Sequence, residues 1–252
     1  MSQSHSIGKG LQPLTNVALM AELIEKLNSR KFGMPGFGVF HGPYGYGKTY
    51  SASFALNMVD AVHVSYVKGW TVKHFLKSIA RAMNLPPLRK SAQWGEYMDA
   101  LIDALRSSGT TLLLDEVNLI VKQELFMETI RVLGDNSQAT VVLIGTDELP
   151  QYLQMHGALS SRCTWCPAQP SDLTDARMLA SYYADGVTIS NDLLEIVVNR
   201  CTGSARLICK ELVQIDEWAV AHGFAEVDAA TAGHIDFSES NSAPIPRKGL
   251  KV

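Results

Sequence analysis

Residues 42–49 read Gly-Pro-Tyr-Gly-Tyr-Gly-Lys-Thr, and this stretch decides the fold. It follows an apolar run at 36–41 (GFGVFH) that predicts a strand, and it precedes a segment that predicts a helix from Lys48. Glycines let backbone N–H groups curl around phosphate oxygens, and the helix N-terminus favours an anion. The stretch therefore predicts a P-loop nucleotide site made of Gly42, Pro43, Tyr44, Gly45, Tyr46, Gly47, Lys48 and Thr49.

Two residues of this loop have predicted roles toward ATP and Mg²⁺. Lys48 is expected to reach the β- and γ-phosphates of ATP, and the Thr49 hydroxyl is expected to bind Mg²⁺. A chance glycine-rich turn is the alternative. The complete match, with a strand before it and a helix after it, argues against that alternative.

A second motif is the apolar run 112–114 (LLL) followed by Asp115 and Glu116. A buried strand delivers its last residues to the carboxyl edge of a sheet, where ligands of open α/β sheets bind. Asp115 is predicted to hold Mg²⁺ and Glu116 to polarise the attacking water. Two solvated acids that cap a strand are the alternative, which the loop at 42–49 makes the weaker one.

The strand predicted at 139–145 (ATVVLIG) is followed by Thr146. A polar side chain at the tip of the strand next to Asp115 could sense the γ-phosphate or orient the lytic water. Thr146 is therefore a third candidate of the site, against the alternative of a simple turn.

The rest of the chain alternates predicted strands and helices up to about residue 168. Strands at 36–41, 61–67, 110–115 and 139–145 are separated by helices, including 71–84, 93–107 and 121–134, which predicts a parallel sheet covered on both faces. Helical patterns at 172–184, 191–201 and 204–222 then predict a small all-α lid. We expect a flexible segment 1–13, an α/β core 14–168, the lid 169–235, and a disordered tail 236–252.

Composition bounds the class of protein. The four cysteines are too few for a disulfide framework, and no apolar run approaches the roughly 18 residues that cross a bilayer. The sequence predicts a cytoplasmic protein that makes no contact with a membrane. Cys163 and Cys166 form a single Cys-x-x-Cys pair, which favours a strand with buried thiols over a zinc site.

The stretch 61–95 is basic although the net charge of the chain is −3. It contains no Asp or Glu and six basic residues, Lys68, Lys73, Lys77, Arg81, Arg89 and Lys90. Lys73 and Lys77 share a helical face close to Lys68 and Trp70, which suits contact with DNA phosphates without base recognition. Double-stranded DNA is the predicted partner, with Lys68, Lys73, Lys77, Arg89 and Lys90 as contacts. A solvated basic face or a protein-binding surface is the alternative.

The order of these motifs, followed by a helical lid, resembles the AAA+ ATPase family over about residues 14–235. The triplet 161–163 (SRC) is similar to that of clamp loaders, and the resemblance implies that Arg162 reaches the ATP of a neighbouring subunit in a homo-oligomer. Arg131 is the alternative for this role. The run 203–206 (GSAR) matches the start of a lid helix in that family, which implies that Arg206 contacts the γ-phosphate within its own subunit.

The stretches LLLDEVNLI, VVLIGTDEL and GSAR resemble the transposition target-selection ATPases of the phage Mu B and TnsC group. The resemblance implies ATP-dependent assembly of a ring or filament on duplex DNA, recruitment of a transposase, and disassembly by hydrolysis, in a bacterial or phage-infected cytoplasm. Lys73 matches a residue that follows the DNA backbone. About 14 residues precede the first helix here, so we do not expect this chain to carry out the function of the extra N-terminal helix-turn-helix domain of the phage Mu protein.

Two other functions stay open from the sequence. A helicase-loader or clamp-loader-like remodeller would act on a protein ring, and the triplet 161–163 supports it. A regulatory ATPase that does not bind DNA is the third possibility, against which the basic stretch argues.

Overall fold

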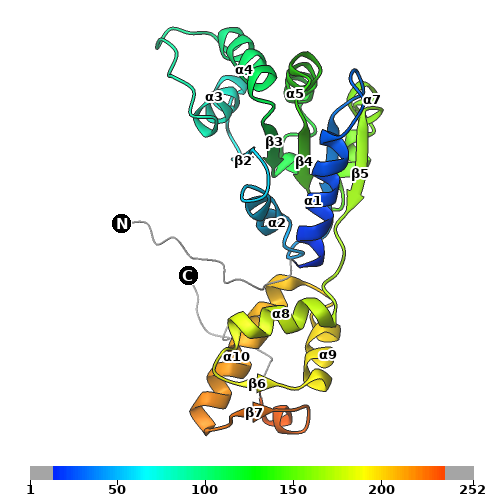
Figure 1. Ribbon diagram of the computed structural model, residues 1–252, viewed down its shortest axis with the longest axis vertical. Helices are drawn as coiled ribbons and strands as arrows, with labels where there is room; N and C mark the ends of the chain where they lie inside the picture. Colours follow the sequence, from blue (N-terminus) through cyan, green and yellow to red (C-terminus); the bar gives the residue numbers. More distant parts are fainter. Residues whose placement is uncertain (1–13, 236–252) are drawn as a thin grey trace, which may run out of the picture. The chain divides into compact units, whose positions relative to one another are not determined.

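The computed structural model describes residues 14–235, which form two compact units (Figure 1). The first unit is Thr15–Gln169, and the second contains residues 170–235 together with Leu14. The expectations for residues 1–13 and 236–252 lie outside the described residues. Along residues 14–235, no helix combines the length and the apolar character that a membrane crossing requires.

The first unit alternates strands and helices along the chain. Its strands are β1 (Phe37–His41), β2 (Ala61–Ser65), β3 (Thr111–Asp115), β4 (Val141–Gly145) and β5 (Cys163–Pro167). Its helices are α1 (Thr15–Asn28), α2 (Lys48–Ala55), α3 (Val72–Ala82), α4 (Trp94–Ser108), η1 (Val117–Leu119), α5 (Glu124–Ser137), α6 (Leu149–Leu153) and α7 (Gly157–Ser160).

The five strands form one parallel sheet in the order β2-β3-β4-β1-β5. The register is regular: Phe37 at the start of β1 lies opposite Val141 on one side and Cys163 on the other. The amino ends of all five strands therefore lie along one edge of the sheet, and their carboxyl ends lie along the opposite edge. This confirms the predicted parallel α/β fold.

Helices cover both faces of the sheet, as the sequence predicts. Strand side chains point alternately to the two faces. Val39, Leu112 and Leu143 belong to the core beneath α3, α4 and α5, whereas Phe40, Leu113 and Val142 belong to the core beneath α1 and α2. The central strands β3 and β4 are buried on both faces, which explains their continuous apolar sequences.

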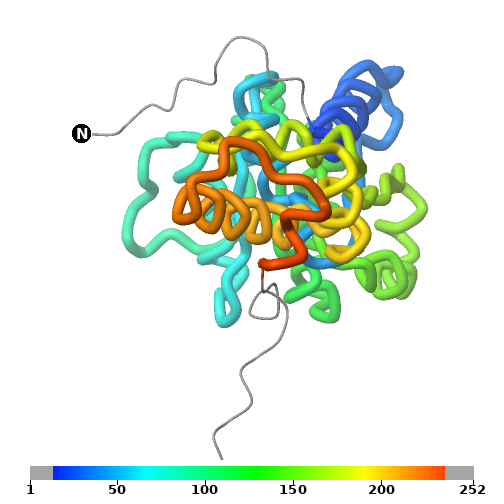
Figure 2. Tube along the Cα trace, turned by 90° about the horizontal axis from the view of Figure 1, so that it is seen from below, coloured from blue at the N-terminus to red at the C-terminus, as the bar shows by residue number. Residues whose placement is uncertain are grey.

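The second unit is built from α8 (Leu173–Tyr183), α9 (Asn191–Arg200), α10 (Ala205–His222) and η2 (Thr231–His234). The three long helices pack on one another around a core of their own, whose members include Leu194, Ile208 and Leu212 (Figure 2). Two short strands, β6 (Thr188–Ile189) and β7 (Glu226–Val227), pair in parallel. The sequence predicts only helices here, because a strand of two residues carries no detectable alternation.

The boundaries of several elements differ from the expectation. The helix predicted at 121–134 begins at Glu124, after the 3₁₀ turn Val117–Leu119, and ends three residues later than expected, at Ser137. Its C-cap is Gln138 with φ of 59°, a left-handed position where glycine is the usual signal. The strand predicted at 61–67 ends at Ser65, because the chain turns at 67–70, where the Trp70 N–H donates to the Val67 carbonyl at 3.2 Å.

Candidate nucleotide-binding site

The predicted phosphate loop leaves the carboxyl end of β1 and enters the first turn of α2. Gly45 and Gly47 have φ of 84° and 76°, in the left-handed region that glycine adopts without strain. A Cβ atom on Gly42 would lie 3.0 Å from the Cβ of Ala168, so the loop passes close to the chain that follows β5. These positions explain why the loop needs glycine at its start and at its end.

Lys48 lies against the loop itself. Its Nζ donates to the carbonyl oxygens of Gly42 and Pro43 at 2.7 Å each, and it lies 5.9 Å from the ring centre of Tyr44. The ammonium group is therefore held against the first residues of the loop.

Thr49 and Asp115, the two candidate Mg²⁺ ligands, come together across 66 residues of sequence. The Thr49 hydroxyl donates to Asp115 Oδ2 at 2.7 Å. A hydroxyl and a carboxylate beside a phosphate loop are the hard oxygen ligands that Mg²⁺ accepts, and Mg²⁺ takes its other ligands from water and phosphate. The pair therefore fits the predicted metal.

The Asp115 carboxylate is 3% exposed but remains ionised. Burial raises its pKa, whereas the nearby His63 ring, the Thr49 hydroxyl and the Glu116 backbone N–H lower it, and the net pKa lies below the ordinary value. His63 Nε2 lies 3.5 Å from Asp115 Oδ2 and has no hydrogen-bond partner among the described residues. The sequence analysis did not identify His63, because the contact depends on the pairing of β2 with β3.

Glu116, the predicted general base, has an unusual backbone. Its φ is 60°, a left-handed value that is uncommon outside glycine. Asn118 Nδ2 donates to its carboxylate at 3.4 Å, and the Asn118 Oδ1 atom is buried without a partner among the described residues. Strained residues of this kind cluster at functional sites, where the surrounding fold holds them in place.

Thr146 lies directly after β4 and is buried. The strand order places β4 between β3, which ends at Asp115, and β1, which leads into the phosphate loop. Thr146 therefore lies at the same edge of the sheet as both motifs, as a γ-phosphate sensor requires.

Asn16 is a part of the site that the sequence analysis missed. Its side chain is buried and bridges two segments: Nδ2 donates to the Tyr46 carbonyl at 2.8 Å and to the Gln169 carbonyl at 2.7 Å, and Oδ1 accepts from the Gln169 N–H at 2.8 Å. Tyr46 belongs to the phosphate loop, and Gln169 is the last residue of the first unit. Asn16 thus ties the loop to the end of this unit.

We expect Asn16→Ala to lower the free energy of unfolding by about 1–3 kcal/mol, because the carbonyls of Tyr46 and Gln169 and the N–H of Gln169 lose the partner that the buried Asn16 side chain provides. Urea denaturation measures this loss, and a titration with ATP should also show weaker binding. Thr129→Val is the matched control, since Thr129 is equally buried but donates only to the Leu125 carbonyl of its own helix. Equal losses of stability and of ATP affinity in both variants would contradict the assigned role.

Arg162 lies at the opposite edge of the sheet from the phosphate loop. It directly precedes β5, whose first residue Cys163 lies opposite Phe37, the first residue of β1, whereas the loop follows the last residue of β1. A strand of five residues spans about 16 Å at the usual rise of roughly 3.3 Å per residue. Arg162 therefore does not belong to the phosphate site of its own subunit.

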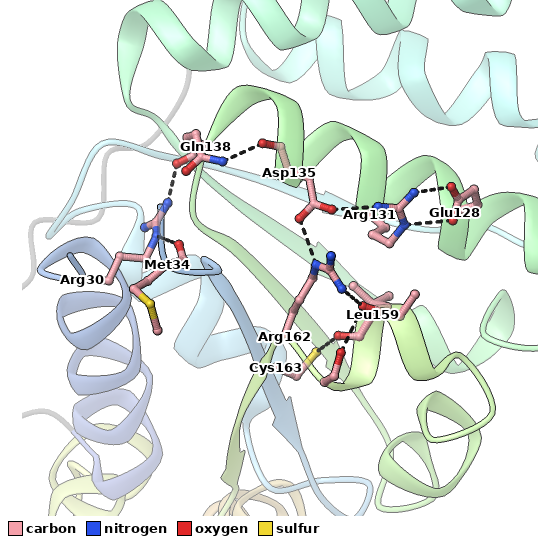
Figure 3. Close-up of polar contacts among 11 residues, drawn as sticks. Arg30, Met34, Glu128, Arg131, Asp135, Gln138, Leu159, Arg162 and Cys163 are labelled. Atoms are coloured by element: carbon pink, nitrogen blue, oxygen red, sulfur yellow. Dashed lines mark hydrogen bonds and ion pairs between the residues drawn. The ribbon is translucent and has the colours of Figure 1, made fainter. Parts of the chain in front are cut away.

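Arg131 and Arg162, the two candidates for the trans-acting arginine, bind the same carboxylate (Figure 3). Arg131 Nη1 lies 2.8 Å from Asp135 Oδ2, and Arg162 Nε lies 3.3 Å from Asp135 Oδ1. Arg131 also bonds to Glu128, and these two carboxylates raise its pKa above the ordinary value. Arg131 is thus held by two acids of its own helix, whereas Arg162 has one acidic partner.

Arg206 belongs to the second unit, where it lies exposed in the first turn of α10. The turn before it requires glycine: Gly203 has φ of 70°, and a Cβ there would lie 2.3 Å from the Cβ of Pro170. The contact of Arg206 with the γ-phosphate stays a prediction.

The basic stretch follows β2 and continues along α3. The buried face of α3 carries Phe75, Leu76 and Ile79, and Lys73 and Lys77 lie beside this face and are half-buried. Lys68, Lys73 and Lys77 form no ion pair with any carboxylate of the described chain.

Arg89 differs from these lysines because it is paired. Its Nη2 lies 2.9 Å from Glu96 Oε2. The Gln93 backbone N–H and the Arg89 guanidinium both lower the pKa of Glu96 below its ordinary value. The stretch 61–95 contains no acidic residue, but in the folded chain Glu96 pairs with Arg89 of this stretch.

Cys163 and Cys166 lie in β5, the strand predicted for them. Burial raises the pKa of the Cys163 thiol to about 12 and also raises that of Cys166. Over residues 14–235 the structure contains no group of three or more His, Cys, Asp or Glu side chains that could hold a metal ion.

The parallel sheet, the phosphate loop and the Thr49–Asp115 pair define the chain as a P-loop ATPase. The sequence profile described as AAA domain matches residues 13–153, more than half of the chain, so the chain belongs to this family. It is therefore an ATP hydrolase of the AAA class. No curated protein sequence matches the chain.

Solved structures share this fold. Cdc6p of Pyrobaculum aerophilum aligns with a TM-score of 0.62 at 16% identity, over 92% of this chain and 70% of that one. The ORC2 protein of Aeropyrum pernix in its ADPNP and ADP complexes aligns with a TM-score of 0.65 at 18% identity, over 91% and 68%. The ORC1 protein of Aeropyrum pernix in complex with DNA aligns with a TM-score of 0.62 at 18% identity, over 88% of this chain and 64% of that one. These likenesses confirm the AAA+ fold.

Proposed function

We propose that this ATPase binds ATP and Mg²⁺ between neighbouring copies and assembles on duplex DNA without sequence preference. The observation that carries the proposal is the separation of Lys48 and Arg162 to opposite edges of one sheet. An arginine that cannot reach its own phosphate loop can reach the loop of a copy joined head to tail. ATP binding by one copy is then coupled to the assembly of that copy with its neighbour.

The chemistry of hydrolysis follows from the positions of the residues. The loop N–H groups and Lys48 bind the phosphates, and Glu116 accepts a proton from the attacking water. Mg²⁺, when bound by Thr49 and Asp115, neutralises charge on the phosphate oxygens. Thr146 orients the water or senses the γ-phosphate, and Arg206 is the proposed contact from the second unit. Arg162 of the neighbouring copy stabilises the charge of the transferring phosphoryl group.

DNA binding is supported by the lysines of α3 and the loop before it. Lys68, Lys73 and Lys77 follow the carboxyl end of β2, and none of the three forms an ion pair within the described chain, although the charge of Lys73 acts on Glu96. Lys90 belongs to the same proposed surface. Lysines of this kind bind phosphates and release counterions without reading bases. The solved ORC1 relative of the same fold is itself in complex with DNA.

The biological setting we propose is transposition. The assembled ATPase would mark target DNA and recruit a transposase, and hydrolysis would release it. The resemblance of the stretches around Asp115, Thr146 and Arg206 to transposition target-selection ATPases supports this setting. Electron microscopy with a non-hydrolysable ATP analogue, with and without duplex DNA, tests the assembly on DNA: filaments or stacked rings that grow with the length of the DNA support the proposal, and monomers under all conditions contradict it.

We expect Lys73→Ala to weaken DNA binding and to reduce the salt dependence. Each phosphate contact contributes about −0.9 to the slope of log K against log salt, so the slope should become less negative by about 0.9. Fluorescence anisotropy with a labelled duplex at several salt concentrations measures both effects.

Arg89→Ala is the matched control for this prediction. Because Arg89 already has Glu96 as a partner, its removal should change affinity and slope less than the removal of Lys73. Binding that does not depend on salt would exclude phosphate contact as its basis.

A remodeller that acts on a protein ring is the second candidate. The triplet Ser161-Arg162-Cys163, which resembles that of clamp loaders, favours it. The same microscopy separates the two functions, because a ring remodeller would form a small closed assembly whose size does not grow with the length of the DNA.

A further inference from the structure

Asp135 occupies a position that disfavours an acid. It lies in the last turn of α5, and that turn contains no basic residue. The carbonyl end of a helix carries partial negative charge, which repels a carboxylate. The carboxylate is nevertheless three-quarters buried, with its side chain 26% exposed. Two arginines compensate for it, one on each oxygen.

The side chains around Asp135 alternate in charge (Figure 3). Glu128 bonds to Arg131, Arg131 bonds to Asp135, and Asp135 bonds to Arg162. The first three residues belong to α5, whereas Arg162 precedes β5. Asp135 is therefore the link between a rigid helix and the arginine at the edge of the sheet.

Arg162 is anchored at two of its three nitrogens. Nε faces Asp135 Oδ1 at 3.3 Å, and Nη1 donates to the Ala158 carbonyl. Because a guanidinium is planar, these two contacts fix the plane of the group and leave Nη2 without a partner among the described residues. A guanidinium held in this way presents the same nitrogen to any ligand that approaches the edge.

We propose that Asp135 is a positioning residue that holds Arg162 ready for the ATP of the neighbouring copy, with Arg131 as its support. This inference rests on the proposed function, because it concerns the arginine that completes the shared site. It also separates the two candidate arginines: Arg162 acts on the phosphate, and Arg131 holds the carboxylate that aims it.

Asp135→Ala should therefore lower kcat by about 10²-fold, the loss that a displacement of roughly 1 Å can cause, and leave the affinity for ATP unchanged. Asp135→Asn should lose less, because its Oδ1 can still accept from Arg162. Asp103→Asn is the control: Asp103 forms an exposed pair with Arg106 at 3.4 Å, away from this cluster. Thermal unfolding of each variant shows whether it is folded.

Mixed assemblies test on which side of the subunit Asp135 acts. Glu116→Gln subunits have an intact Arg162 but lack the general base. Mixing them with Asp135→Ala subunits should restore turnover. At one kind of interface, the correctly held Arg162 of a Glu116→Gln subunit faces the intact phosphate site of an Asp135→Ala subunit. Mixing Asp135→Ala with Arg162→Ala subunits should restore nothing, because both are defective on the same side.

The outcomes separate this inference from the proposal beneath it. If a mixture of Arg162→Ala and Glu116→Gln subunits shows no turnover, the proposal that two subunits share the ATP site is contradicted. If they succeed, the positioning role is overturned by full turnover in Asp135→Ala, by rescue of Asp135→Ala with Arg162→Ala, or by a failure of Glu116→Gln to rescue it.

Discussion

Replacing Arg162 with alanine is expected to lower the kcat of the assembled ATPase by about 10³- to 10⁵-fold, the contribution of an arginine supplied to a transferring phosphoryl group. Binding of ATP to separate subunits should not change, because Arg162 lies at the edge of the sheet remote from its own phosphate loop. Steady-state phosphate release in the presence of duplex DNA measures the first effect, and titration of dilute subunits with a fluorescent ATP analogue measures the second.

Two comparisons give this prediction its specificity. A mixture of Arg162→Ala subunits with Asp115→Asn subunits should recover part of the activity, since one interface in the mixture combines an intact site with an intact arginine. Arg131→Ala should lose less than Arg162→Ala. No recovery at any ratio, or a larger loss in Arg131→Ala, would assign the trans-acting role to Arg131 or to a group in the same subunit.

The second large effect is expected from Glu116→Gln, with a loss of about 10²- to 10⁴-fold in kcat, the usual contribution of a general base. The glutamine side chain can still accept a hydrogen bond from Asn118 but cannot take a proton from water. ATP binding and assembly should persist, so the variant should accumulate as stable assemblies on DNA. Phosphate release and sedimentation with DNA measure the two properties.

Glu124→Gln is the control for this substitution, because Glu124 begins α5 and is exposed. It should hydrolyse ATP at the normal rate. Normal hydrolysis by the Glu116→Gln variant would remove the assigned role of Glu116, and failure of that variant to assemble would indicate that the carboxylate is needed before the chemical step.

The sequence predicts most of the fold because the strands are buried on both faces. Continuous apolar runs such as 112–114 and 141–144 mark central parallel strands, and the phosphate loop fixes the direction of β1. Boundaries set by single residues are harder to predict. Gln138 ends α5 in a left-handed conformation without glycine, and the pair β6–β7 is too short to leave a pattern.

The candidate site is predicted only where its residues follow strands. Thr49, Asp115 and Thr146 are found this way, because strand ends gather at one edge of a parallel sheet. Asn16 and His63 contact the site across the fold, through groups that no local spacing reveals. The acidic partners of the basic residues cannot be predicted from the sequence either. Glu96 pairs with Arg89, and Asp135 pairs with Arg162, only in the folded chain.

In the proposed assembly, the placement of Arg162 and the phosphate loop at opposite ends of the strands would give the series of subunits a direction. Copies joined through these two features all point the same way, and their contact is heterologous, so the series closes into a ring or continues as a helix. An open series has unlike ends: one exposes an unused arginine and the other an unfilled loop. Growth and loss of subunits would then differ between the two ends, and the polymer would carry polarity onto DNA whose two directions are otherwise equivalent.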